Sequence, residues 1–256
     1  MATPEKKEEP KKVRPLLELA KCSKATHPPN PQDYGPIITV TVGNWSSKRE
    51  FHVYEGLLSH YSSYFKAAVK DCWGNSKTVE LKDDNPEVFQ AFFHWVYTGK
   101  LYFALDASGE VPLDFPLIYE IYIFGDARGA LDLCNAAIDL LIQKMDQEWA
   151  FPQLHLSYIY ENTLTGSALR KVLVDFAIDT FRFTDLVDPS QRAKEMVSYP
   201  HEFFAELVVA FMALGAEPIP SCVGYATPSG GKTSDWASFI KPLICSRYHD
   251  HPAPPA

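Results

Sequence analysis

The sequence lacks the features that mark several large classes of protein. Its five cysteines lie far apart and form no C-x-x-C pair, which favours free thiols in a reducing compartment over a disulfide framework or a zinc site. No uncharged apolar run approaches the roughly 18 residues of a membrane-spanning helix. The first twelve residues contain no apolar stretch that suits a signal peptide. These absences predict a cytoplasmic or nuclear protein without a membrane segment.

Basic charge is also scarce. The chain carries 24 Lys and Arg against 32 Asp and Glu, a formal net charge of −8. Its one lysine-rich stretch, residues 6–12, is interrupted by Glu8 and Glu9. Because nucleic-acid binding draws much of its affinity from Lys and Arg against phosphates, we predict no nucleic-acid partner. A DNA-binding transcriptional regulator, for which zinc-finger spacing is missing too, therefore ranks last among the functions considered.

Signatures of catalysis are missing as well. The sequence contains no H-E-x-x-H, G-x-S-x-G or G-x-G-x-x-G motif. Of its eight histidines only His249 and His251 are close, in a proline-rich tail. Cys134, on an apolar helical face, is interpreted as a core residue, and Asp83 and Asp84 as residues that cap a following helix. We therefore predict no catalytic residue, no cofactor and no metal.

The stretch ATPSGGKT, residues 226–233, fits a loose form of the phosphate-binding P-loop. A working P-loop needs a buried strand before it and a helix after it. Here two prolines precede only Cys222 and Val223, and Pro242 limits any following helix to about two turns. We interpret the stretch as a surface turn and predict no nucleotide binding.

Strand signals open the ordered part of the chain. Residues 37–43 hold six β-branched residues and end in Gly43, and residues 49–54 alternate apolar and polar side chains. Both patterns predict strands, paired through a turn at residues 44–48. A third short strand is predicted over residues 78–83.

Helical spacing of apolar residues follows these strands. Asp84 or Asn85, Asp114 and Ser167 stand where helix-capping residues are expected. Gly99 suits the left-handed residue that ends a helix. The predicted helices cover residues 57–68, 86–98, 115–125, 126–145, 166–181 and 201–215.

Proline and charge mark the predicted boundaries. Residues 1–35 are predicted to be a disordered or partly helical tail, because prolines cluster at its end and a few leucines follow Pro15. The other predicted segments are an α+β domain over residues 36–145, a helical extension over 146–215, and a loop-rich region over 216–256 that ends in a disordered tail.

Short motifs between Ile37 and Phe103 carry a family resemblance. They are V-x-V-G (40–43), F-x-V (51–53), LL (57–58), S-x-Y-F (62–65), L-x-D-D-x-P-E-V-F (81–89) and W-V-Y-T-G-K-L (95–101). With these motifs in this order, the chain resembles a BTB/POZ domain protein of the fungal type, with a C-terminal helical extension. The resemblance implies an α+β fold in which a small β-sheet is flanked by a helical cluster and followed by an all-α extension.

The chain departs from the family pattern at two places. Ile37 stands where the family often has an aspartate, and Tyr54 and Glu55 stand where a histidine and a lysine often occur. Charged residues near these places help form a partner groove in BTB transcription factors. We therefore do not expect a co-repressor groove of that kind.

The resemblance implies a non-enzymatic protein-interaction module that self-associates as a homodimer. Leu16, Leu17 and Leu19 are candidates for the N-terminal helix that many BTB dimers exchange, the alternative being a disordered tail with a few leucines. Tyr102 and Phe103, at the end of the matching segment, are the other interaction candidates.

The resemblance leaves one further alternative, a substrate adaptor of a cullin-type ubiquitin ligase. Family members in that role tend to carry a hydrophobic residue two positions before a glutamate after the W-V-Y-T-G helix. The only glutamate there is Glu110, and Ser108 stands two positions before it. No separate substrate-binding domain is visible in the sequence.

Overall fold

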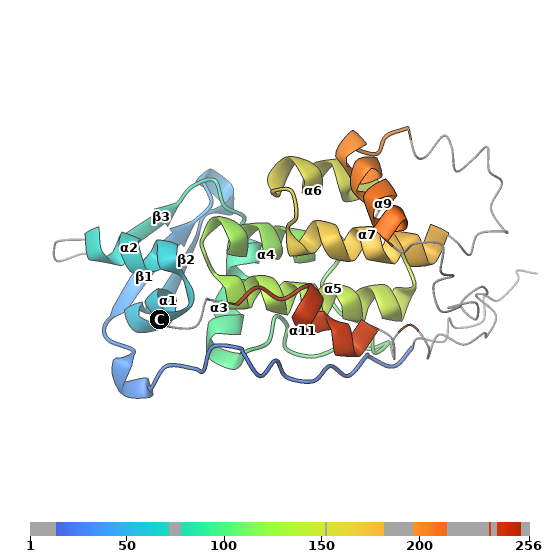
Figure 1. The fold of residues 1–256 in the computed structure, drawn as a ribbon. Helices are drawn as coiled ribbons and strands as arrows, with labels where there is room; N and C mark the ends of the chain where they lie inside the picture. The colour runs from blue at the N-terminus through green and yellow to red at the C-terminus, as the bar shows by residue number, and fades with distance from the viewer. Residues whose placement is uncertain are drawn as a thin grey trace, which may run out of the picture.

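The structure, a computed structural model, describes residues 14–71, 78–151, 153–181, 197–213, 236 and 240–251. A small sheet with three helices occupies one end of the molecule, and a cluster of further helices extends from it (Figure 1). This arrangement confirms the predicted α+β fold with a helical C-terminal region.

The sheet contains three strands in the order β2-β1-β3: β1 (Ile37–Val42), β2 (Arg49–Tyr54) and β3 (Thr78–Leu81). β1 and β2 pair antiparallel with Val40 opposite Phe51, as the turn between them predicted. β3 pairs parallel to β1 with Val40 opposite Val79, a pairing that the sequence did not predict.

Two helices stand where the sequence predicted one over residues 57–68: α1 (Glu55–Tyr61) and α2 (Ser63–Asp71). Ser62 adopts an extended conformation between them. Its hydroxyl donates to the Arg128 carbonyl (2.6 Å) and accepts from the Phe65 backbone N–H (3.1 Å). The prediction of one continuous helix was wrong, because this contact with a distant segment divides it.

Helix α3 (Pro86–Thr98) begins and ends as its sequence predicted. The Asn85 side chain accepts from the Glu87 backbone N–H (2.9 Å), and Gly99 takes a left-handed conformation with its N–H bonded to the Trp95 carbonyl (2.8 Å). Asp84, the alternative cap, instead accepts from the Arg128 guanidinium (2.6 Å).

The helical cluster contains α4 (Phe115–Ala127), α5 (Leu131–Glu148), α6 (Leu156–Asn162), α7 (Ala168–Phe181), α9 (His201–Ala213) and α11 (Ile244–Arg247). Short 3-10 turns cover Pro31–Asp33, Trp45–Ser47, Gln153–His155 and Lys241–Leu243. The sequence predicted neither α6 nor α11. It predicted α4 and α5 over slightly different bounds, with Asp114 capping α4 by accepting from the Leu117 N–H (2.9 Å).

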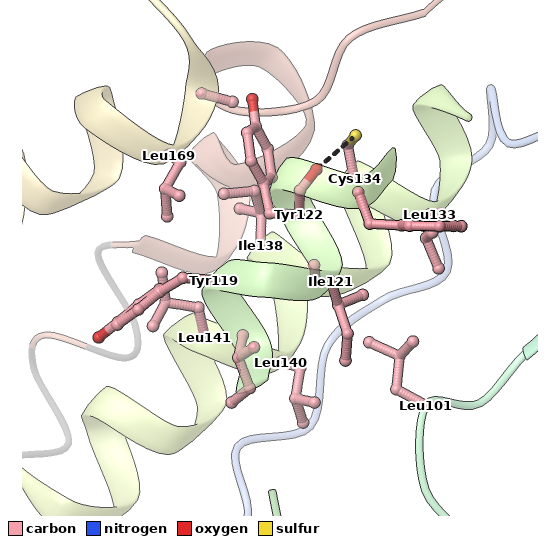
Figure 2. Close-up of a cluster of buried hydrophobic side chains, with 14 of the residues drawn as sticks. Leu101, Tyr119, Ile121, Tyr122, Leu133, Cys134, Ile138, Leu140, Leu141 and Leu169 are labelled. Carbon is pink, nitrogen blue, oxygen red and sulfur yellow. Dashed lines mark hydrogen bonds between the residues drawn. The ribbon is translucent and has the colours of Figure 1, made fainter. Parts of the chain in front are cut away.

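Helix α5 lies at the centre of the cluster. Its side chains Ile138, Leu141 and Met145 are fully buried, and the helix contacts both α4 and α7. Figure 2 shows Ile138 and Leu141 in the cluster that α4 and α7 complete. One continuous set of buried apolar side chains runs from the sheet through α5 to α7 and α9. The sheet region and the helical extension therefore share a single core.

Both ends of the described chain lie against α5 (Figure 1). Residues 14–30 contain no helix, which differs from the predicted helical piece after Pro15. Gln143 of α5 donates to the Leu17 carbonyl (2.8 Å), so the backbone at Leu17 bonds to α5. His249 and Asp250, predicted to belong to a disordered tail, hydrogen-bond to Asp139 and Asn135 of α5.

Candidate protein-interaction surface

The segment that follows α3, residues 99–105, forms a ridge on the surface. Tyr102 is half-buried, whereas Phe103 is 89% exposed and stacks on the His94 ring with 4.2 Å between centroids. Gly99 turns the chain sharply at the end of α3 and brings these aromatic side chains beside the helix. The ridge therefore presents a large apolar side chain to solvent.

A groove of about 580 Å³ runs along one side of this ridge. We call it the α3 groove. Strand β2, helix α3, the ridge and the start of α4 supply its walls. They contribute mostly apolar side chains, with Glu87 and His94 as the ionisable exceptions. The lining residues are Phe51, Glu87, Gln90, Ala91, Phe93, His94, Leu101, Tyr102, Phe103, Leu113 and Leu117.

A second groove, of about 490 Å³, borders the same ridge. We call it the α5 groove, because Ala136, Asp139, Leu140 and Gln143 of α5 form its far wall. Leu16 of the N-terminal segment closes it. Leu101, Tyr102 and Phe103 line both grooves.

The structure brings three of the five predicted interaction residues together: Leu16, Tyr102 and Phe103 all line the α5 groove. The other two pack inward. Leu17 is only 6% exposed, and Leu19 is half-buried against the core. Sequence reasoning missed Phe51, Phe93 and Leu117, which line the α3 groove. Their spacing looked like that of ordinary core residues.

Contacts with α5 hold the N-terminal segment beside the grooves. The Arg14 guanidinium lies over the Trp149 ring (5.3 Å to the centroid) and donates to the Asp146 carbonyl (3.0 Å). The side-chain amide of Gln147 donates to the Arg14 carbonyl (3.1 Å). Leu16 is thus positioned within its own chain.

The three ridge residues that line both grooves are uncharged at neutral pH, and Lys100 lines the α5 groove beside them. Burial raises the pKa of Tyr102, so its phenol stays protonated. Phe103 and Leu101 carry no polar side-chain atoms. A partner that covers the ridge therefore does not have to strip water from a charge on these residues.

The loop between α3 and α4 is polar around Asp106. Asp106 accepts hydrogen bonds from the Ser108 N–H (2.8 Å), the Ser108 hydroxyl (2.6 Å) and the Glu110 N–H (2.9 Å). The bond from the Ser108 hydroxyl, followed by that from the Glu110 N–H, lowers the pKa of Asp106. Ser108 is exposed and presents no apolar side chain to a partner.

Cys134 lies where the sequence predicted, on the buried face of α5. Its thiol is 3.5 Å from the Tyr122 carbonyl oxygen, and burial raises its pKa well above the ordinary range (Figure 2). A buried thiol of this kind stays protonated and unreactive.

Four side chains of the metal-ligating kind lie close together, while the absence of a bound metal stays a prediction. Cys22, Cys245, His249 and His251 place their ligand atoms within 4.8 Å of one another. The sequence did not reveal this, because Cys22 lies 223 residues before Cys245. The sequence signal that could have pointed to the cluster is the partial pattern C-x₃-H-x-H, which Cys245, His249 and His251 form. The proposed surface turn at residues 226–233 lies outside the described residues.

Comparison with protein families identifies residues 38–115 as a BTB/POZ domain. This confirms the resemblance for that segment, while the fungal type and the relation of the extension to it stay predictions. A comparison with curated proteins finds no match. Among the described residues, no helix combines the length and the apolar character needed to cross a membrane. The cytoplasmic or nuclear location stays a prediction.

Proposed function

We propose that this chain is a protein-interaction module that self-associates as a homodimer through its BTB/POZ domain. Domains of this family are generally protein–protein interaction modules. The observation that carries the proposal is Phe103, 89% exposed on a ridge that borders two apolar grooves. A clustered apolar surface of this kind marks interaction sites on globular proteins.

The shape of this surface favours a second copy of the same chain as the partner. An isologous two-fold interface needs a patch that is complementary to itself. Here a convex aromatic ridge lies directly beside concave apolar grooves. A two-fold axis near the ridge would place Phe103 of each copy in a groove of the other.

The N-terminal segment supports the same surface. Leu16 forms part of the α5 groove, and all three leucines pack in or against the core, which holds the segment in position. We assign Leu16 to the partner contact and the other two leucines to its support. If the two subunits exchanged this segment, it would make the same contacts with α5 of the other copy that it now makes with α5 of its own chain.

Support for a cullin adaptor is weaker. Ser108 offers an exposed hydroxyl where family members in that role tend to carry an apolar side chain, and Asp106 ties this loop to itself. The net charge of −8 does not favour a DNA-binding transcriptional regulator.

Sedimentation velocity of the full chain tests self-association. We expect a dimer at tens of micromolar (roughly the range of a modest protein interface). Phe103→Ser should weaken the dimer by about 30-fold or more, because loss of a central aromatic anchor costs about 2 kcal/mol or more. Trp45→Ser is the matched control, since Trp45 is 93% exposed but lies away from both grooves.

Two results would contradict the proposal. One is a wild-type chain that stays monomeric at these concentrations. The other is a dimer that Phe103→Ser and Trp45→Ser weaken equally, which would place the interface elsewhere. Circular dichroism of each variant checks that the fold is intact.

A further inference from the structure

Four metal-ligating side chains meet where the two ends of the described chain lie together beside α5. Cys22 comes from the N-terminal segment, and Cys245 lies on α11. His249 and His251 follow α11 in the last described residues. Their ligand atoms all lie within 4.8 Å of one another.

The distances match the size of a tetrahedral metal site. His251 Nε2 lies 3.5 Å from Cys22 Sγ and 3.4 Å from Cys245 Sγ, and the two sulfur atoms are 3.3 Å apart. Zinc bonds of about 2.3 Å to sulfur and about 2.0–2.1 Å to nitrogen imply about 3.6 Å between sulfur and nitrogen and about 3.8 Å between sulfurs. The sulfur–nitrogen distances agree closely, and the sulfurs need to separate by only a few tenths of an ångström.

His249 is oriented as zinc-binding histidines are. Its Nε2 lies 3.0 Å from the Asp139 carboxylate, and its side chain is only 4% exposed. If Nε2 carries the proton that is donated to Asp139, Nδ1 has a free lone pair for a metal. Nδ1 is buried and makes no hydrogen bond with any described residue. A metal ion would satisfy this otherwise unpaired atom.

We propose that Cys22, Cys245, His249 and His251 bind one Zn²⁺ in a closed, four-coordinate structural site. Two thiolates and two imidazoles form a ligand set typical of structural zinc. Asp139 is a positioning residue, because it orients His249 without contacting the ion.

Other contacts hold the ligands in place. The Asn135 side chain makes two hydrogen bonds with the backbone of Asp250 (2.8 and 3.0 Å), directly between the two histidines. Asp175 of α7 accepts from Arg247 (2.5 and 2.6 Å) and from the Tyr248 hydroxyl (2.7 Å). The residues before and between the histidine ligands are thus fixed to α5 and α7.

Zinc at this position would tie the N-terminal segment to the C-terminal segment across 223 residues of chain. A cross-link that closes a long loop removes conformational entropy from the unfolded chain. It would also fix the segment that carries Leu16, which lies six residues before Cys22 in the sequence.

Metal analysis of the full chain, purified with its thiols reduced, tests the site. We expect one zinc ion per chain. We also expect that Co²⁺, added after zinc is removed, gives the visible bands of tetrahedral cobalt and a thiolate-to-cobalt charge-transfer band. Cys22→Ser and Cys245→Ser should each lose most of the zinc and the charge-transfer intensity.

Matched controls separate the site from general effects. Cys134→Ala removes a buried cysteine outside the cluster, and His52→Ala removes an exposed histidine on β2. Both variants should keep one zinc ion. Asp139→Asn should keep tetrahedral cobalt bands but weaken zinc affinity by about 10–100-fold, as expected for a residue that only orients a ligand.

Three results would overturn the proposal. The reduced wild-type chain could bind neither zinc nor cobalt. Cys22 and Cys245 could form a disulfide in the purified chain, with a mass lower by two hydrogen atoms and no bound metal. The control variants could lose metal as completely as the cysteine variants. The cobalt spectrum of the wild-type chain decides the question even if a ligand variant fails to fold.

Discussion

At the residue scale, Arg170 connects three helices from a buried position. It is 5% exposed and donates to the carbonyls of Tyr160 and Thr163 and to the Thr163 hydroxyl. It also pairs with Glu206 of α9 (3.5 Å). The planar guanidinium satisfies several acceptors at once, which a point charge cannot do.

Arg170→Ala should lower the free energy of unfolding by about 3–5 kcal/mol, because it leaves buried carbonyl acceptors unsatisfied and removes the ion pair with Glu206, which keeps only the Tyr160 hydroxyl as donor among the described residues. Arg170→Lys should recover only part of this loss, since an ammonium group cannot reproduce the forked geometry. Lys171→Ala, at an exposed neighbouring position, should change stability by less than about 0.5 kcal/mol. Urea unfolding measures all three.

A loss of less than about 1 kcal/mol in Arg170→Ala would show that water replaces the guanidinium at little cost. The sequence did not single out Arg170, because it reads as an ordinary polar residue beside the apolar face of a helix. Cys134 was interpreted correctly as core, since its apolar helical neighbours made that burial visible.

At the element scale, α4 and α5 approach closely at Gly125 (Figure 2 shows the neighbouring Cys134). A Cβ atom at Gly125 would lie 2.8 Å from Cys134 Sγ and 3.3 Å from Leu133 Cδ2. The absence of a side chain therefore allows these two helices to pack at their present distance.

Gly125→Ala should destabilise the protein by about 1–3 kcal/mol, the usual cost of overpacking. Cys134→Ala in the same chain removes the sulfur that the new methyl group meets. The double variant should therefore be more stable than the sum of the two single changes predicts, by about 0.5 kcal/mol or more. Thermal and urea unfolding of the wild-type chain, the two single variants and the double variant complete a double-mutant cycle. Strictly additive changes in stability would argue against a direct clash.

Sequence signals close to the ends of a helix were sufficient to predict its bounds. The caps of α3 lie within a few residues of its ends, so its bounds were predicted closely. The division at Ser62 was not predicted, because it depends on Arg128, 66 residues away. The α3 groove was missed for a similar reason, since it joins β2, α3 and α4.

At the scale of the whole molecule, the BTB/POZ segment does not have a core of its own. The family match ends at residue 115, yet Ile138 and Leu141 of α5 and Leu169 and Leu173 of α7 belong to the same buried cluster as the sheet. The predicted boundary at residue 145 falls inside α5, which continues to Glu148. The extension is therefore part of what stabilises the domain.

A fragment of residues 36–151, which keeps α5 intact, should be much less stable than the full chain. Each large apolar side chain that becomes exposed to water lowers the folding stability by about 1.5–3 kcal/mol. Removing α7 would expose several such side chains. We expect a lower melting temperature, broad unfolding by circular dichroism, and binding of a hydrophobic dye. A fragment that melts cooperatively at the temperature of the full chain would show that the two parts fold independently.

The sequence by itself determined the three strands, α3 with its two caps, the start of α4 at Asp114, and the BTB/POZ resemblance, because those signals lie within a few neighbouring residues. Only the tertiary structure decided the parallel pairing of β3, the division at Ser62 and the meeting of Leu16 with Phe103 at one groove. It alone brought Cys22 to Cys245 and the two histidines. These features join residues far apart in the chain, and helix packing fixes their distances, which no local pattern encodes.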